Sequence, residues 1–305
     1  MDAAELERTV VDALGARVTR VERLRSLWAG YGELLRVTLE GRGPVIVKHV
    51  RPPAALRGDG DPSHARKLRS YDVETEWYRR WAPRTDDACR VPRLLAARAE
   101  GGAWVLVLED LDAAGFARRT SAPSRAELDR CVRWLAAVHA RFVGATPDGL
   151  WPVGTYWHVA TRAEELARMT DARLREAAPA LDARLEACAF RTIVHGDAKE
   201  ENFCFGDHGV AAVDFQYAGG GCGVKDLAYL LYGRWGTSEE ARALDVYFDA
   251  LRAARADGAA IERAWRALYP LACADFCRFL AGWAPAQWAR DGAAQARARE
   301  ALAAL

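Results

Sequence analysis

Two short apolar runs, each broken off by polar residues, constrain this chain of 305 residues more than any other feature. Residues 193–194 predict a strand, which ends in the tight loop 195–197, where glycine permits an unusual backbone. Residues 203–213 predict a hairpin of two strands around a glycine-containing turn. Asn202 precedes this hairpin and Asp214 follows it, so we expect the hairpin to bring the two side chains together.

The residue types at these positions suit the transfer of a phosphoryl group. That reaction needs a group that orients the attacking hydroxyl, metal ions that bridge phosphate oxygens, and a cation over the developing charge. Asp197 is the predicted catalytic base, and Lys199 is the predicted cation. The alternative for Lys199 is a solvated lysine that balances the acidic residues 200–201. Asn202 and Asp214 offer oxygen ligands that suit a hard cation such as Mg²⁺.

Three motifs in this half of the chain carry a resemblance to a known family. His195-Gly196-Asp197 with Asn202, Asp214-Phe215-Gln216 and Asp226-Leu227-Ala228 resemble the motifs of protein-kinase-like small-molecule kinases. This superfamily includes aminoglycoside phosphotransferases, choline kinases and ecdysteroid-kinase-like proteins. The resemblance implies Asp197 as the base and Asn202 and Asp214 as magnesium ligands. It also implies that Asp226 braces the catalytic loop.

The same resemblance implies an α+β, bilobal fold of the protein-kinase type. Residues 1–110 would form a mainly β amino-terminal lobe with a helix, which binds the nucleotide. Residues 111–305 would form a mainly helical carboxy-terminal lobe with the catalytic loop and the acceptor site. The chain would be an ATP-dependent phosphotransferase that acts on a hydroxyl group of a small molecule, ecdysteroid-kinase-like or aminoglycoside-phosphotransferase-like. Its cofactors would be ATP and Mg²⁺, with GTP left open as the nucleotide.

Lysine is scarce in this chain, because only four of its 43 basic residues are lysine and the others are arginine. A position that keeps lysine is therefore a candidate for a compact point charge, which a planar guanidinium cannot imitate. Lys48 lies in an apolar segment that predicts a strand, as the nucleotide-binding lysine of the resembled family does. Lys199 is the second candidate. Lys67 and Lys225 have no role that the sequence assigns.

The amino-terminal region predicts a small β-rich lobe. Its apolar patterns predict one helix and three strands, at 2–14, 17–24, 34–39 and 45–50. Gly30 and Gly32 lie between the first two strands, in a turn whose backbone N–H groups are predicted to cover nucleotide phosphates. An ordinary hairpin turn is the alternative.

The polar segment 51–64 predicts a long loop, and a helix is expected over 72–81. Glu74 shares one face of that helix with three aromatic residues, and a buried charge among them needs a partner. Lys48 is the expected partner. Such a pair resembles the lysine–glutamate pair with which kinases hold phosphates. Glu76, which faces elsewhere, is the competing choice.

Residues 104–108 predict a buried strand that ends in an acidic turn. In the resembled family this junction is the hinge between the lobes. Its backbone groups, here at Glu109 and Leu111, bind the adenine ring. A strand followed by an ordinary turn is the alternative that the sequence leaves open.

The carboxy-terminal half predicts helices. Ser124 and Thr161 each stand three residues before a glutamate, which is the spacing of a capping box. His139 lies on the apolar side of the first of these helices. We expect it to be a hydrogen-bonded core residue rather than a metal ligand.

Aromatic residues are abundant in this half and predict an acceptor pocket, because Trp and Tyr faces bind apolar, ring-containing or quaternary-ammonium groups. The predicted substrate-binding residues are Gln216, Trp157, Trp235 and Trp283. Residues 239–305 contain nine acidic residues and nine arginines. No acidic trough for a polycationic aminoglycoside is therefore visible.

Composition excludes several classes of protein. A net charge of +1 argues against a nucleic-acid-binding surface. The seven cysteines show no paired spacing, so neither a disulfide framework nor a zinc site is indicated. No apolar run is long enough to span a membrane. We expect a cytoplasmic protein whose partner is a small-molecule acceptor, and the sequence leaves the oligomeric state open.

Three alternatives compete with this interpretation: a choline or ethanolamine kinase, a protein kinase, and a nucleotide-binding relative without activity. Against a protein kinase, Gln216 replaces the glycine of Asp-Phe-Gly, and no Ala-Pro-Glu sequence follows. Against an inactive relative, every predicted catalytic side chain is present.

Overall fold

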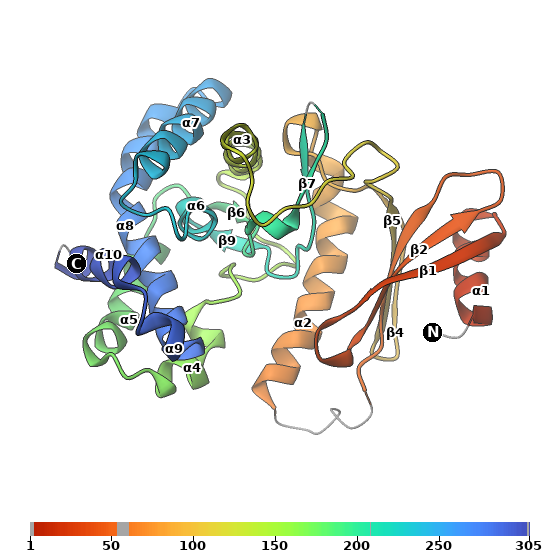
Figure 1. Cartoon of the computed structure of the whole chain (residues 1–305), viewed down its shortest axis with the longest axis horizontal. Coiled ribbons are helices and arrows are strands. Elements are labelled where there is room, and N and C mark those ends of the chain that lie inside the picture. The colour runs from red at the N-terminus through yellow and green to blue at the C-terminus, as the bar shows by residue number, and fades with distance from the viewer. Residues whose placement is uncertain (1–2, 54–60, 208, 304) are drawn as a thin grey trace. The chain divides into compact units, whose positions relative to one another are not determined.

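The computed structural model describes residues 3–53, 61–207, 209–303 and 305, with side chains from residue 8 onward. Part of the predicted loop 51–64 therefore lies outside the described residues. The fold is α+β, as predicted, with a five-stranded antiparallel sheet near the amino terminus and a helical carboxy-terminal region (Figure 1). The chain divides into two compact units. Unit 1 comprises Met1–Asp86, Arg90–Arg119 and Cys204–Gln216, and unit 2 comprises Asp87–Cys89, Thr120–Phe203 and Tyr217–Leu305.

The sheet of unit 1 has the strand order β1-β2-β3-β5-β4. Its strands are β1 (Val18–Ser26), β2 (Gly32–Leu39), β3 (Val45–Val50), β4 (Leu94–Glu100) and β5 (Ala103–Glu109). Apolar side chains at alternate positions of β2 and β3, such as Val37 and Val47, pack with Val10 of helix α1 (Ala3–Leu14). The helix and the three strands predicted before residue 51 are thus confirmed.

Helix α2 (Pro62–Glu76) begins before the predicted start at residue 72, so that boundary was wrong. Asp61 caps the helix, because its carboxylate accepts a hydrogen bond from the N–H of Ser63 at 2.8 Å. Proline in the first turn is a second start signal. The Pro- and Gly-rich composition of the preceding segment masked both signals. At its other end α2 continues into a π-helical turn, Trp77–Trp81.

Unit 2 is mainly helical and is built around the long helix α8 (Gly258–Trp283), most of which is buried. Its other helices are α3 (Arg125–Phe142), α4 (Ala163–Arg168), α5 (Ala172–Glu186), α6 (Val224–Leu230), α7 (Ser238–Ala254), α9 (Pro285–Trp288) and α10 (Gly292–Ala303). Six of these seven pack extensively against α8, and α3 contacts α8 through the rings of His139 and Trp265, whose centroids lie 6.0 Å apart. This helix therefore forms the core of the unit.

Four three-residue strands surround the predicted loop. β6 (Thr192–Val194) confirms the strand predicted at 193–194, and it pairs with β9 (Gly219–Gly221), which was not predicted. β7 (Phe203–Phe205) and β8 (Val210–Ala212) form the predicted hairpin. A run of three glycines is typical of a turn, but here a Cβ on Gly219 would lie 2.4 Å from the carbonyl oxygen of Trp151. The glycines thus allow close packing.

The two predicted capping boxes have different outcomes. The box at Ser124 is confirmed, because the N–H of Ser124 donates to the carboxylate of Glu127 at 2.8 Å and the N–H of Glu127 donates to Ser124 Oγ at 3.4 Å. The box at Thr161 was wrong. The hydroxyl of Thr161 donates to the carbonyl of His158 at 2.9 Å, and Arg162 occupies the N-cap of α4. A local hydrogen bond thus competes with capping.

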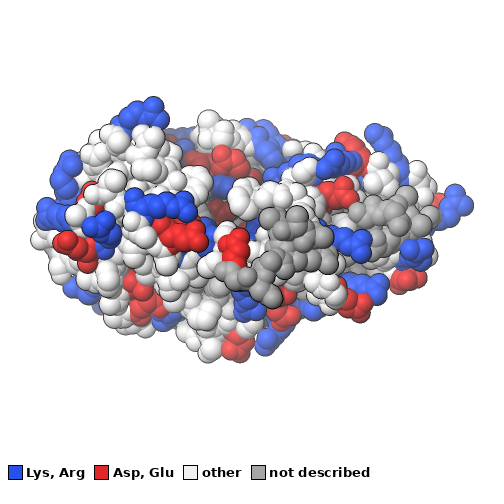
Figure 2. Space-filling view, turned by 90° about the horizontal axis from the view of Figure 1, so that it is seen from below, with Lys and Arg blue, Asp and Glu red and all other residues white. Residues whose placement is uncertain are grey.

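Charges are mixed on the surface of the described residues. On the face shown in Figure 2, acidic and basic side chains are interspersed. No helix in the described part of the chain combines the length and the apolar character needed to cross a bilayer. All seven cysteines are buried free thiols.

Gly282, near the end of α8, tests how tightly α4 and α8 pack. A Cβ at this position would lie 1.9 Å from the carbonyl oxygen of Glu165. A glycine-to-alanine change in an open helix is normally stabilising by up to about 1 kcal/mol. We expect Gly282→Ala instead to lower the free energy of unfolding by about 1–3 kcal/mol, because backbone atoms must move to make room. Denaturant unfolding measures the difference.

Gly292→Ala is the matched control. Gly292 begins α10, and nothing lies within 4 Å of the Cβ that alanine would add. We expect no loss of stability in this variant. An equal loss in both variants would contradict the steric explanation.

Candidate active site

Lys48 and Glu74 form a buried ion pair in unit 1. Lys48 lies on β3, and its Nζ is 2.8 and 2.6 Å from the two carboxylate oxygens of Glu74 on α2. The predicted pair is therefore confirmed. The competing Glu76 contacts Arg79 and Arg80.

Asp214 lies close to the same lysine, with its Oδ1 3.8 Å from Lys48 Nζ. Burial raises the pKa of Glu74, and the negative charge of Asp214 raises it further, while Lys48 acts in the opposite direction. The Glu74 carboxylate thus depends on Lys48 to stay ionised.

The segment that carries Asp214 is held against α2. Asp214 has a φ of +70°, a conformation that costs a residue with a side chain about 1–3 kcal/mol and persists only where its surroundings hold it. The ring of Phe215 stacks on Trp77, with ring centroids 4.2 Å apart, and meets Tyr78 edge-on at 5.9 Å. Gln216, predicted to bind substrate, is buried and accepts hydrogen bonds from α2.

Gly30 lies between β1 and β2, as predicted, whereas Gly32 is the first residue of β2. A Cβ on Gly32 would lie 2.0 Å from the carbonyl oxygen of His49, so glycine lets β2 approach β3 closely. Gly30 has a φ of +74°, and its N–H closes the turn by donating to the carbonyl of Leu27 at 3.2 Å. That the backbone N–H groups of this turn cover nucleotide phosphates stays a prediction.

Glu109 and Leu111 lie at the end of β5, where the hinge was predicted. The Glu109 carboxylate accepts hydrogen bonds from Arg90 at 2.7 Å and from the N–H of Arg93 at 3.1 Å. Burial would raise the pKa of Glu109, but these bonds outweigh burial and lower it. The Leu111 carbonyl accepts from the N–H of Phe116 at 2.8 Å. Adenine binding by the backbone here stays a prediction.

In unit 2, the buried carboxylate of Asp226 holds the start of the loop 195–202, which was predicted to be catalytic. Its oxygens accept hydrogen bonds from the N–H groups of His195 at 2.6 Å and Gly196 at 2.9 Å. Gly196 has a φ of +80°, and a Cβ on it would lie 2.1 Å from the carbonyl oxygen of Tyr217. Asp226 therefore braces the loop, as the resemblance implies.

Hydrogen bonds continue from Asp226 into the core. His139 Nε2 lies 3.0 Å from the Asp226 carboxylate, and His139 Nδ1 lies 2.7 Å from the hydroxyl of Tyr247. His139 is fully buried, so its predicted role as a core histidine is confirmed. Burial alone would raise the pKa of Asp226. Its hydrogen bonds with His139 and Gly196, with the charge of neighbouring histidines, outweigh burial and hold that pKa below its ordinary value of 3.8.

Asp197, Lys199 and Asn202 lie together in the braced loop. Asn202 Nδ2 donates to the backbone carbonyl of Asp197 at 2.8 Å and to its carboxylate at 3.0 Å. Lys199 Nζ lies 3.6 Å from the same carboxylate oxygen. Glu200, one of the two acids that the alternative assigned to Lys199, forms an ion pair with Arg234 at 2.7 Å.

Asn202 and Asp214 fit Mg²⁺ by the type of their atoms. The amide nitrogen of Asn202 is committed to Asp197, so its carbonyl oxygen is the atom left to act as a ligand. Magnesium at nucleotide sites is usually held by one or two carboxylates together with phosphate oxygens. Among the described residues, no three His, Cys, Asp or Glu side chains gather as metal ligands.

The three tryptophans predicted to line the acceptor pocket have different surroundings. Trp157 is fully buried, and its Nε1 donates to Asp275 at 3.1 Å. Trp235 is 7% exposed and packs edge-on against Tyr232 at 5.3 Å. Trp283 is 60% exposed. Of the three, Trp283 is the one with a surface that a ligand can meet without displacing the core.

Two tyrosines flank the catalytic loop in unit 2. The N–H of Tyr156 donates to the carbonyl of Gly196 at 3.0 Å, and its ring lies 5.4 Å from that of Tyr229. Burial raises the pKa of both hydroxyls, and the negative charge of Asp197 raises both further. Tyr229 was not predicted as a site residue, because its position within the apolar pattern of α6 is typical of a core residue.

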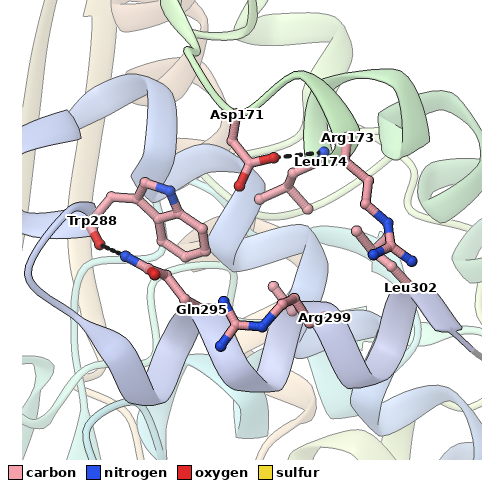
Figure 3. Close-up of a pocket in the computed structure, with 8 residues that line it drawn as sticks. Asp171, Arg173, Leu174, Trp288, Gln295, Arg299 and Leu302 are labelled. Atoms are coloured by element: carbon pink, nitrogen blue, oxygen red, sulfur yellow. Dashed lines mark hydrogen bonds between the residues drawn. The ribbon is translucent and has the colours of Figure 1, made fainter.

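A separate pocket of about 220 Å³ lies among α5, α9 and α10 (Figure 3). Asp171 there caps α5 by accepting from the N–H of Leu174 at 3.0 Å. The exposed side chains of Arg173 and Arg299 are among its lining residues. None of the predicted site residues lines this pocket.

Comparison with known proteins agrees with the fold. Residues 24–271 match the phosphotransferase enzyme family. A protein from Thermobifida fusca provisionally identified as a fructosamine-3-kinase is 22% identical, with a TM-score of 0.61 and 99% of each chain covered. A choline kinase from Streptococcus pneumoniae is 18% identical, with a TM-score of 0.58 and 99% of each chain covered.

A third solved structure is a thermostable mutant of the aminoglycoside phosphotransferase APH(4)-Ia, in complex with ADP and hygromycin B. It is 13% identical, with a TM-score of 0.57 and 98% of each chain covered. No curated protein sequence matches the chain significantly. At these identities the structural likenesses establish the fold.

Asp226→Asn tests the brace. An amide offers one acceptor oxygen in place of two, so a buried loop N–H loses its partner, at a cost of about 1–3 kcal/mol. We expect the free energy of unfolding to fall by that amount at pH 7. Because the pKa of Asp226 is lowered by folding, its contribution is present above the ordinary value of 3.8 and is lost as the pH falls through the folded value. The difference between wild type and variant should therefore shrink in acid.

Asp245→Asn is the matched control, since Asp245 forms an exposed ion pair with Arg266 at 2.8 Å. Exposed pairs contribute at most about 1 kcal/mol. Denaturant unfolding at pH 7 and pH 3 measures both variants. A loss of stability for Asp226→Asn no larger than that of the control would contradict the brace.

Proposed function

Because the chain belongs to the phosphotransferase enzyme family, we propose that it transfers the γ-phosphoryl group of ATP to a hydroxyl group of a small molecule. The observation that carries the proposal is the meeting of Asp197, Lys199 and Asn202 in one braced loop. Phosphoryl transfer depends mainly on positioning and electrostatic stabilisation. Here the positions are set by hydrogen bonds within the protein itself.

Each residue of the loop has a proposed role. Asp197 orients the acceptor hydroxyl and accepts its proton, while the two hydrogen bonds from Asn202 keep the carboxylate in one position. Lys199 places its ammonium over the negative charge of the transferred group. Mg²⁺, held by Asn202 and Asp214, would neutralise charge on the phosphate oxygens.

Unit 1 supplies the proposed nucleotide-binding groups. Lys48, oriented by Glu74, binds phosphate oxygens, and the backbone at Glu109 and Leu111 binds adenine. The turn at 30–32 covers the phosphates. The presence of ADP in the complex of one structural neighbour supports a nucleotide as the donor.

Aromatic side chains near Asp197 form the proposed acceptor surface. Tyr156 contacts Phe279 edge-on at 5.1 Å, and the ring of Phe279 stacks on the exposed Trp283 at 5.7 Å. Phe279 is itself buried, so the rings left to contact an acceptor are the partly exposed Tyr156 and Tyr229 and the exposed Trp283. These rings suit an acceptor with an apolar or ring-shaped body, in keeping with an ecdysteroid-kinase-like role. Aromatic faces also bind quaternary ammonium groups, so choline or ethanolamine is the second candidate.

A screen for ADP release identifies the acceptor. Sterols, sugars, amino alcohols and aminoglycosides cover the classes named above. An accepted substrate should lose turnover in Trp283→Ala through a higher KM for the acceptor and an unchanged KM for ATP. If none of these acceptors causes ADP release, the proposed range of acceptor classes is wrong. If the protein does not bind ATP, the proposed function itself is wrong.

Asp197→Asn is expected to abolish turnover while leaving nucleotide affinity nearly unchanged, because it removes the base and keeps the shape. Loss of a general base typically lowers kcat by about 10²–10⁴-fold. Steady-state kinetics measures kcat, and calorimetry with ADP measures the affinity. Near-normal turnover would remove Asp197 from the mechanism.

Lys199→Ala is expected to lower kcat by about a hundredfold with little effect on ATP affinity, because its interaction strengthens only as the transition state forms. Lys199→Arg should restore activity only in part, since a planar fork does not reproduce a point charge. The alternative of a solvated surface lysine predicts the same kcat in wild type and both variants. Kinetics at saturating ATP distinguishes the two.

A further inference from the structure

Lys67 is a lysine for which the proposed function has no role. It lies on α2, and its Nζ donates to Gln216 Oε1 at 2.7 Å. The hydroxyl of Ser70, three residues along the same helix, lies 3.2 Å from that oxygen and shares its one proton between it and the carbonyl of Lys67, 2.7 Å away. Gln216 is 6% exposed, so both bonds are largely shielded from water. A hydrogen bond from an ammonium is about twice as strong as one between neutral groups.

Asp214, Phe215 and Gln216 are all held by one face of α2 and of the π-helical turn that extends it. For Asp214 the contact is indirect, through Lys48, which pairs with Glu74 of that face. Residues 67, 70, 74 and 77 follow helical spacing and share that face. Gln216 bonds to residues 67 and 70, and Phe215 stacks on Trp77. Asp214 lies 3.8 Å from Lys48, which Glu74 holds. The contacts thus hold all three residues of the segment against one face of the helix.

These contacts matter for Asp214 because its backbone conformation needs support from neighbouring residues. A φ of +70° is unfavourable for aspartate, so the conformation must be imposed by its neighbours. The stacked ring of Phe215 resists separation from α2 but permits sliding. A directional bond at Gln216 fixes the position along the helix. A glycine in the place of Gln216 would have no side chain with which to form this bond.

We propose that Lys67 and Gln216 form a clamp that positions Asp214 for binding of the divalent cation, which makes Lys67 a positioning residue for phosphoryl transfer. This inference rests on the proposed function. The clamp fixes Gln216, two residues after Asp214, and thereby the direction of the Asp214 carboxylate. Loss of the clamp therefore weakens the metal-dependent part of nucleotide binding. Metal-free nucleotide binding does not use Asp214 and is left unchanged.

Calorimetry with ADP tests the clamp, with titrations over a range of MgCl₂ concentrations and in EDTA. We expect Lys67→Met and Gln216→Met each to raise the Mg²⁺ concentration for half-maximal tightening of ADP about tenfold. The ADP affinity in EDTA should stay the same. The double variant should be no worse than either single variant, because both changes remove one interaction. Lys67→Arg keeps a cationic donor and should restore part of the effect.

Arg66→Met is the matched control, since Arg66 precedes Lys67 on the helix and donates to Ser63. We expect it to leave the Mg²⁺ dependence at the wild-type value. Thermal unfolding of every variant shows whether it is folded. If Lys67→Met does not fold, Lys67→Arg and Gln216→Met carry the test, and wild-type Mg²⁺ dependence in Gln216→Met overturns the clamp.

Other outcomes also overturn the proposal. Equal weakening of ADP binding with and without Mg²⁺ would show a purely structural contact, and additive effects in the double variant would show two independent contacts. Asp214→Asn in the same titration separates this inference from the proposed function. If Asp214→Asn raises the Mg²⁺ requirement and Lys67→Met does not, only the clamp fails. If Asp214→Asn has no effect, the proposed metal ligand fails and the clamp fails with it.

Discussion

The geometry of the loop 195–202 depends on one buried carboxylate. Burial of a charge is costly unless hydrogen bonds replace the lost water, and Asp226 receives them from two consecutive loop N–H groups and from His139. The same bonds hold Gly196 in a conformation that side chains rarely adopt. Asp197 is the next residue of the loop after that glycine. The backbone direction at Asp197 is thus fixed by a residue to which the proposed mechanism gives no chemical role.

Helix α2 has the corresponding role in unit 1. It supplies Glu74 to a lysine on β3 and holds Gln216 by hydrogen bonding, and Trp77 in the π-helical turn that follows it stacks on Phe215. The sheet contributes Lys48, whose charge alone would be costly in a buried position. Removal of one partner from such a pair typically costs about 3–5 kcal/mol. Lys48, Glu74 and the segment 214–216 that follows β8 therefore depend on each other for their positions.

Much of this was predictable from the sequence, because the signals are local. Strands, the hairpin and the Lys48–Glu74 pair follow from apolar patterns and from the face on which Glu74 lies. The start of α2 had a local signal, Asp61 followed by proline, which the surrounding composition masked. The bonds of His139 had no local signal, since His139 lies 87 residues from Asp226 and 108 residues from Tyr247 in the chain. Contacts of that kind are set by packing alone.

Two of the four lysines, Lys48 and Lys225, lie in buried surroundings that favour lysine over arginine. Lys225 is fully buried, with its Nζ 3.5 Å from Asp275, and Arg278 already occupies the other oxygen of that carboxylate at 2.8 Å. A guanidinium has five N–H donors and an ammonium has three. Each buried donor needs an acceptor, so a second arginine would leave more donors unsatisfied than lysine does. The same reasoning applies at Lys48, whose hydrogen bonds go to one carboxylate. At these two buried positions, lysine therefore leaves fewer donors unsatisfied than an arginine would.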